Sequence, residues 1–172
     1  MVYINTKGAE MNFVDRLNEC SDFSCVFELV KAAVEVTMNR RRVGLMLGLT
    51  DLPNYIGAFH QIGSNFIVMN KRLLKEVMRS DNRKLINAYI FHVLLHEYIH
   101  SLGYLEEQKT QLLTQAISEK VLGSEHPATL IARYGISSVF SNINRLEHYE
   151  PQEIRDIEII EDFERDNLNY FG

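Results

Sequence analysis

The most constraining feature of this sequence is one long helix that must be buried on nearly every side. The segment from Arg83 to Leu102 has large apolar residues at all angles around the helix axis, namely Leu85, Ile86, Ile90, Phe91, Val93, Leu94, Leu95, Ile99 and Leu102. A surface helix is apolar along one stripe only, so a helix that is apolar all round lies in a protein core or in a membrane.

Ionisable residues within this segment decide between a core and a membrane. His92, His96, Glu97 and His100 interrupt the apolar surface, and such groups are costly inside a lipid bilayer. We therefore expect a core helix and no membrane partner. With 172 residues, 46% of them hydrophobic, the chain is long enough to bury this helix in one core without a disulfide or a second subunit.

The polar residues of the helix also form a chemical pattern. His96, Glu97 and His100 make H-E-x-x-H. Residues four apart are neighbours on a helix, so both imidazoles can bind one metal ion, and Glu97 lies close enough to serve as general base for a metal-bound water. A carboxylate and two imidazoles are costly to bury unless a cation compensates them. The pattern predicts one Zn²⁺ ion.

The rest of the chain predicts an α+β fold. Helices are expected over 13–38 with a break near 21–24, and over 70–79, 104–122, 128–134 and 137–146. Short apolar runs at 43–49, 55–59 and 66–69 predict strands. Their connections are too short for helical crossovers, so adjacent strands should run antiparallel. The expected fold is a short antiparallel sheet packed on helices, including the buried H-E-x-x-H helix.

Charge divides the chain into two parts. Residues 146–172 have a net charge of about −7, whereas residues 1–145 are close to neutral. We expect a domain over 1–145 and an acidic C-terminal extension over 146–172. Within the extension, apolar residues recur about every third position, at Ile154, Ile157, Ile160 and Phe163. This spacing predicts a final amphipathic helix docked on the domain.

Composition also bounds the partners and the compartment. The only dense basic cluster is Arg40, Arg41 and Arg42, which we interpret as a solvated helix end, so DNA is not expected as a partner. The start of the chain lacks the pattern of a secretory signal. The two cysteines, Cys20 and Cys25, are interpreted as buried thiols. These features favour a cytoplasmic protein.

The H-E-x-x-H segment resembles the active-site helix of the zincin metallopeptidases. The longer zincin signature has Val or Thr three residues before the first His, uncharged residues around it and a hydrophobic residue two after the second His. Val93 and Leu102 stand at the two apolar positions. In size the chain is similar to the small single-domain minigluzincins of prokaryotes. The resemblance implies that 1–145 is a zincin-like catalytic domain.

A second zincin pattern fits less well. Gly103 and Glu106 stand where the metzincin pattern H-E-x-x-H-x-x-G-x-x-H has its Gly and third His. Metzincins also need a Met-turn after the motif, and all six methionines of this chain precede it: Met1, Met11, Met38, Met46, Met69 and Met78. A gluzincin-like site is therefore favoured.

The third metal ligand is expected on the helix that follows the motif. That helix must begin near the metal, because five residues separate His100 from Glu106. On a helical wheel Glu106 shares an arc with Leu105, Leu113, Ala116 and Ile117, whereas Glu107 lies with Gln111, Thr114 and Ser118. We predict Glu106 as the ligand, with Glu107 as the second choice and Glu119 or His126 as further alternatives.

The resemblance also implies further site residues, and among the candidate oxyanion donors it leaves the choice open. In zincins the strand upstream of the active-site helix binds an extended peptide by main-chain pairing, which implies substrate binding at Phe66, Ile67, Val68 and Met69. An oxyanion could receive a hydrogen bond from Tyr98, Tyr104, Tyr134 or His126. His92 is expected to be a core histidine or a neighbour of the metal ligands, and His60 and His148 ordinary loop residues.

Three functions remain open. The first is a zinc metallopeptidase that hydrolyses a peptide or protein through a zinc-bound water activated by Glu97. The second is a metal-dependent endoribonuclease, because His96 to Glu106 also resembles the H-x-x-x-H-x-x-G-Y-x-H pattern of a small bacterial family, which has Gly and His where Glu97 and Glu106 stand. The third is a non-catalytic interaction protein whose acidic tail binds a partner or covers the cleft. The sequence leaves the oligomeric state open.

Overall fold

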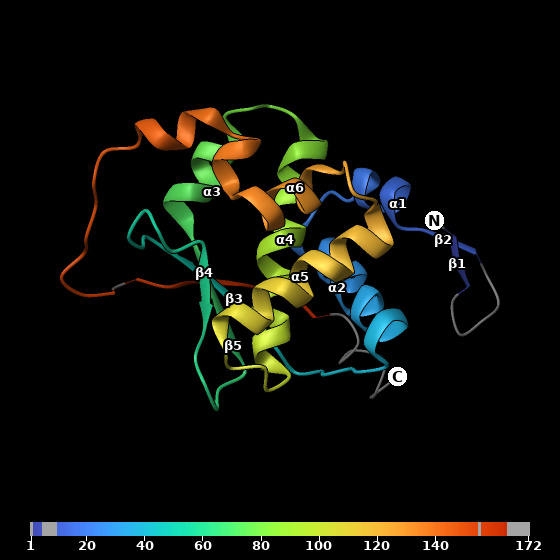
Figure 1. The fold of residues 1–172 in the computed structure, drawn as a ribbon. Helices are drawn as coiled ribbons and strands as arrows, with labels where there is room; N and C mark the ends of the chain where they lie inside the picture. Colours follow the sequence, from blue (N-terminus) through green and yellow to red (C-terminus); the bar gives the residue numbers. More distant parts are fainter. Residues whose placement is uncertain (1, 5–9, 155, 165–172) are drawn as a thin grey trace.

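The computed structural model describes residues 2–4, 10–154 and 156–164, and within these ranges the fold is α+β, as predicted (Figure 1). The elements run β1 (Val2–Ile4), β2 (Glu10–Asn12), α1 (Phe13–Glu19), α2 (Phe23–Met38), β3 (Met46–Thr50), β4 (Ala58–His60), β5 (Phe66–Asn70), α3 (Lys71–Met78), α4 (Arg83–Ser101), α5 (Glu107–Leu122), α6 (Pro127–Tyr134), the 3₁₀ turns η1 (Ile136–Ser138) and η2 (Ser141–Arg145), and β6 (Glu158–Ile160).

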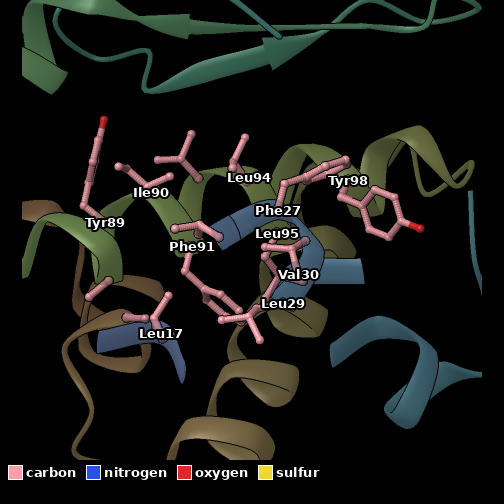
Figure 2. Packing of buried hydrophobic residues seen from close by; sticks show 14 of the residues in the cluster. Leu17, Phe27, Leu29, Val30, Tyr89, Ile90, Phe91, Leu94, Leu95 and Tyr98 are labelled. Carbon is pink, nitrogen blue, oxygen red and sulfur yellow. The ribbon is translucent and has the colours of Figure 1, made fainter. Parts of the chain in front are cut away.

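The central element is α4, which carries the H-E-x-x-H motif. It packs against α2, α5, α6 and β4, and Phe91, Leu94 and Leu95 have no exposed surface. Figure 2 shows Ile90 and Leu94 pointing toward the sheet, whereas Phe91 and Leu95 lie on the side of α2. The prediction of a buried core helix is confirmed. None of the described helices combines the length and apolar character needed to cross a membrane.

The sheet that packs on α4 is mixed rather than wholly antiparallel. Its strand order is β4-β5-β3-β6. As predicted, β4 pairs antiparallel with β5, in the register Phe59 to Val68. However, β3 pairs parallel with β5, with Gly48 opposite Val68. The prediction assumed that strands next to one another in sequence would pair, but the chain leaving β3 crosses to the far side of β5 before β4 forms.

One buried side chain holds this crossover in place. The Asn70 amide Nδ2 donates to the carbonyl oxygens of Leu52, Pro53 and Ile56, at 3.2, 3.0 and 2.8 Å. Its Oδ1 accepts from the backbone N–H groups of Arg72 and Leu52. Asn70 therefore begins α3 and also fixes the turn that leads into β4.

The acidic extension docks as a strand, not as the predicted helix. β6 pairs antiparallel with β3 on the edge opposite β4. Ile157 packs into the space that a Cβ on Gly48 would fill, whereas Phe163 is buried and stacks on Phe27 with 4.3 Å between ring centroids. The threefold spacing of apolar residues was misleading, because the unpaired edge of β3 binds this segment through its main chain.

The cysteines also depart from the prediction. Cys20 and Cys25 form a disulfide, with 5.5 Å between their Cα atoms. Two cysteines five apart in one helix could not reach this geometry, but α1 ends at Glu19 and α2 begins at Phe23, so the break brings them together. The interpretation of two buried thiols was wrong, and it no longer supports the expectation of a cytoplasmic protein.

Candidate metal centre

Three side chains from α4 and α5 converge on one point. The Nε2 atoms of His96 and His100 lie 2.8 and 3.0 Å from the two carboxylate oxygens of Glu107. One potential ligand atom from each residue lies within 4.8 Å of the others. The imidazoles are mostly buried, with 13% and 15% of their side chains exposed, whereas the Glu107 side chain is 74% exposed. The cluster therefore opens to solvent on the Glu107 side.

The link between α4 and α5 brings these residues together. Gly103 follows the end of α4 with a φ of +100°, a left-handed conformation that favours glycine. The chain then reverses, and Glu107 stands in the first turn of α5. Because α5 starts so soon after the motif, its first carboxylate reaches both imidazoles.

The orientation of the second imidazole is set by the same link. His100 Nδ1 lies 2.7 Å from the carbonyl oxygen of Tyr104, which also accepts from Thr110 Oγ1 at 3.0 Å. The carbonyl oxygen can only accept, so Nδ1 carries the proton. A neutral imidazole then presents a lone pair at Nε2, as metal ligation requires.

The donor set fits a divalent cation. The Nε2 lone pair of His100 and an oxygen of Glu107 face each other at 3.0 Å, which is favourable only when a proton or a cation lies between them. Burial lowers the pKa of the His96 imidazole, which favours its neutral, metal-binding form. Two imidazoles and one carboxylate are the ligands of many catalytic Zn²⁺ sites, and also of non-haem Fe(II) sites.

The carboxylate in this cluster is Glu107, the second choice of the sequence analysis, and not Glu106. Glu106 is the exposed N-cap residue of α5 and lies outside the cluster. On the helical wheel the arc of Leu105 and Leu113 was expected to be the inner face, but Leu105 is 58% exposed. The inner face instead carries small hydroxyl residues and a few apolar ones: Thr110, Thr114, Ile117, Ser118 and Val121. Glu119 and His126 are also outside the cluster.

The proposed base, Glu97, is on α4, and its carboxylate accepts a hydrogen bond from β4. Its side chain is buried, and burial is the main cause that raises its pKa to about 7; the Glu107 carboxylate acts in the same direction. A hydrogen bond from the backbone N–H of His60 opposes this shift, as does the electrostatic attraction of the His100 imidazole whenever that ring is protonated. A carboxyl group with a pKa near neutrality can both accept and return a proton at physiological pH.

A cleft of about 410 Å³ opens beside the three residues of the motif. One wall is the turn and strand 55–60 together with Ile62. The other wall is formed by α4 and the start of α5. The full lining is Tyr55, Ile56, Gly57, Ala58, Phe59, His60, Ile62, His92, Val93, His96, Glu97, His100, Leu105, Glu107 and Gln111.

The strand at this cleft is β4, whereas the prediction placed substrate binding on β5 at Phe66, Ile67, Val68 and Met69. β5 has paired neighbours on both sides, so its main chain has no free edge. β4 is an edge strand, and Asn70 N–H donates to Gly57 O at 2.8 Å. Because main-chain groups alternate along an antiparallel pair, those of Ala58 and His60 point to the free edge.

His60 is a cleft residue that the sequence analysis missed. Its backbone N–H binds Glu97, its Nε2 lies 3.1 Å from Ser64 O, and its Nδ1 is buried without a hydrogen-bond partner among the described residues. The sequence did contain a signal for His60. It directly follows the predicted strand 55–59, and a strand extended by one residue would place His60 on the same face as Ala58. His148, by contrast, is exposed.

His92 also lines the cleft, one turn before His96. The ring centroids are 6.5 Å apart, and His92 Nδ1 is buried without a partner among the described residues. Burial lowers the pKa of His92 to about 3, so the ring is neutral. The four residues proposed as oxyanion donors, Tyr98, Tyr104, Tyr134 and His126, do not belong to the cleft lining, as far as the described part of the chain shows.

The arginine cluster was interpreted as a solvated helix end, but two of its side chains, Arg40 and Arg42, donate hydrogen bonds to backbone carbonyl oxygens. Arg42 donates to the carbonyl oxygens of Ser101, at the end of α4, and Ser64, in the β4–β5 turn. Arg40 donates to Leu102 O at 3.3 Å. Cations at a helix C-terminus are stabilising, and here they also tie α4 to the turn that follows β4.

Comparison of the chain with protein-family models, with curated proteins and with solved structures gave no match.

Proposed function

We propose that this chain is a zinc-dependent metallopeptidase in which His96, His100 and Glu107 hold the ion and Glu97 transfers the proton. The observation that carries the proposal is the place of Glu97: a buried carboxyl group with a pKa near 7, in the same cleft as the three ligands. A structural metal site has four protein ligands and no need of such a group, whereas a hydrolytic site needs a base.

The protein side chains have separate tasks in this reaction. Bound zinc would lower the pKa of a water molecule and polarise the peptide carbonyl. Glu97 accepts the proton of the attacking water and then donates it to the leaving nitrogen. The N–H of His60 holds the Glu97 carboxylate toward the free edge of β4. A peptide bound along that edge would thus place its scissile bond beside the base.

The main-chain groups of β4 suit an extended peptide. Ala58 offers an N–H and a C=O at the free edge, and His60 offers its C=O. Addition of a strand to an exposed sheet edge is a common mode of peptide recognition. Substrate binding therefore moves from β5 to β4 in this proposal.

The substitution Glu97→Gln tests the proposal. Gln keeps the size of the side chain and can still accept from the His60 N–H, so the fold and zinc binding should persist. Peptidase activity of the zinc-loaded protein on casein should fall by about 10²–10⁴-fold, the usual contribution of a general base. Zinc content and the unfolding temperature are measured on the same samples.

A matched substitution separates the base from a general effect of acidic residues. Glu106→Gln removes an exposed carboxylate nine residues along the chain and should leave casein hydrolysis unchanged. Equal activity of wild type and Glu97→Gln would refute the role of Glu97. A wild-type protein that binds zinc but cleaves no peptide would refute the peptidase.

A further inference from the structure

Three large apolar side chains at the mouth of the cleft are exposed to solvent. Tyr55, Ile62 and Leu105 line the cleft, yet they are 76, 72 and 58% exposed. Tyr55 precedes β4 and Ile62 follows it, so these two lie at opposite ends of the strand. Leu105 is in the link between α4 and α5, on the other wall. Large apolar side chains gathered around a cavity are typical of a surface that another molecule covers.

The charges of the cleft limit what that molecule can be. No Lys or Arg lines the cleft among the described residues, so apart from the proposed ion no basic side chain is available for a phosphate, an acidic side chain or a C-terminal carboxylate. The two acidic lining residues are Glu97 and Glu107. Both have tasks in the proposed reaction, so neither is free to bind the amino group of a peptide N-terminus.

We propose that the cleft binds an internal, extended peptide segment with large apolar side chains on both sides of the scissile bond, and that Tyr55, Ile62 and Leu105 select it. This inference rests on the proposed function. The three residues of β4 cover roughly 10 Å of an extended chain. A segment paired along β4 would pass Tyr55 at one end of the strand and Ile62 at the other, and would face Leu105 across the cleft.

Specificity is first tested by binding, independently of turnover. The protein is zinc-loaded Glu97→Gln, and the probes are hexapeptides blocked at both ends, with either Leu and Phe or two Asp residues at the central positions. Calorimetry should show at least tenfold tighter binding of the apolar peptide, because a buried large apolar side chain contributes more than the 1.4 kcal/mol that corresponds to tenfold. Equal affinities would overturn the inference.

A matched pair of variants then tests the residues. Leu105→Ser in the same background should weaken binding of the apolar peptide about threefold to tenfold. The control is Leu112→Ser, which removes a leucine of similar exposure, 61%, on α5 outside the cleft lining, and should change nothing. Equal effects of the two variants, or none from Leu105→Ser, would contradict selection by the mouth of the cleft.

Cleavage by the wild type separates this inference from the peptidase proposal. Blocked apolar hexapeptides should be cut internally, and no faster when either end is left free. Cleavage without apolar preference would overturn the inference but keep the peptidase. If zinc-loaded wild type binds the apolar peptides in the cleft but does not cleave them, the apolar preference is kept and the peptidase proposal is overturned.

Discussion

The two edges of the four-stranded sheet differ in how their polar groups are satisfied. At the β6 edge, the Lys31 ammonium is fully buried and lies 2.8 Å from Glu28 and 3.0 Å from Glu164. Glu164 also accepts from Leu45 N–H at 2.7 Å. At the β4 edge, His60 Nδ1 and His92 Nδ1 are buried without partners among the described residues, and burial raises the pKa of Glu97.

We interpret this difference as one between a part of the fold that provides stability and the part that holds the proposed site. A buried charge is tolerated when it is paired and hydrogen-bonded, as Glu164 is. A buried polar group without a partner costs free energy, and such groups with shifted pKa values gather at functional sites. The contrast teaches that the C-terminal segment covers one edge of the sheet, at β3, whereas the edge at β4, beside the cleft, has no further strand among the described residues.

The largest expected effect is the loss of zinc affinity when the carboxylate of the His96–His100–Glu107 group is removed. Glu107→Ala should weaken zinc binding by about a thousandfold, more than the 10–100-fold expected when only a partner of a ligand is lost. Because the Glu107 side chain is 74% exposed, the metal-free fold should be unaffected. Competition with a zinc chelator measures the affinity.

Glu106→Ala is the matched control for this prediction. It removes the neighbouring exposed carboxylate, which lies outside the cluster, and should leave zinc affinity within about twofold of wild type. A greater loss from Glu106→Ala than from Glu107→Ala would restore the original assignment of the third ligand.

The next effect is at the opposite edge. Glu164→Ala leaves the buried Lys31 with Glu28 but without its second carboxylate, and it removes the acceptor of Leu45 N–H. Breaking a buried pair in this way should lower the free energy of unfolding by about 3 kcal/mol. Urea denaturation measures the loss.

Zinc affinity of Glu164→Ala should stay within about twofold of wild type when it is measured below the unfolding transition. A variant that loses zinc and stability together would show that the two edges are coupled, and the contrast between them would fail.

A smaller effect is expected from a residue that orients a ligand. Thr110→Val removes the hydroxyl that donates to Tyr104 O, the same carbonyl that fixes His100 Nδ1. Val keeps the shape of the side chain, so the expected change is a loss of about tenfold or less in zinc affinity. Thr114→Val is the control, because its hydroxyl donates to Thr110 O, one turn farther along the same buried face. Equal losses in both variants would rule out an effect through His100.

The last effect concerns pH and lies outside both edges. Burial lowers the pKa of His126 from 6.5 to about 4, so the unfolded chain binds more protons than the folded one between these values. Stability should therefore be complete above pH 6.5 and fall as the pH drops toward 4, by at most about 1.4 kcal/mol per pH unit from this group.

His126→Asn removes this titration and keeps an acceptor for Ala128 N–H at the start of α6. In urea denaturation of metal-free protein from pH 4.5 to 7, the slope of stability against pH should be shallower for the variant. An unchanged slope would show that His126 titrates normally in the folded protein.

The features that the sequence predicted correctly depend on local signals. The buried helix, its H-E-x-x-H motif and the break between α1 and α2 each follow from residues a few positions apart. The choice of the third ligand, by contrast, depended on which face of α5 is buried. Thr110 and Thr114 lie on that face, and their hydroxyl groups hid it from a search for apolar residues. The formation of β6 depends on pairing with β3, more than 100 residues earlier in the chain. The spacing of apolar residues within 154–163 carries no information about that partner.

The central claim is that His96, His100 and Glu107 together bind one divalent ion. X-ray absorption at the zinc edge of the zinc-loaded protein, residues 1–172, tests it most directly. The account predicts one zinc per chain, with two imidazole nitrogens at about 2.0–2.1 Å and carboxylate or water oxygens completing the shell. In Glu107→Ala the imidazole signal should fall with zinc occupancy. A wild-type protein that binds no zinc, or zinc whose spectrum lacks imidazole scattering, would contradict the claim.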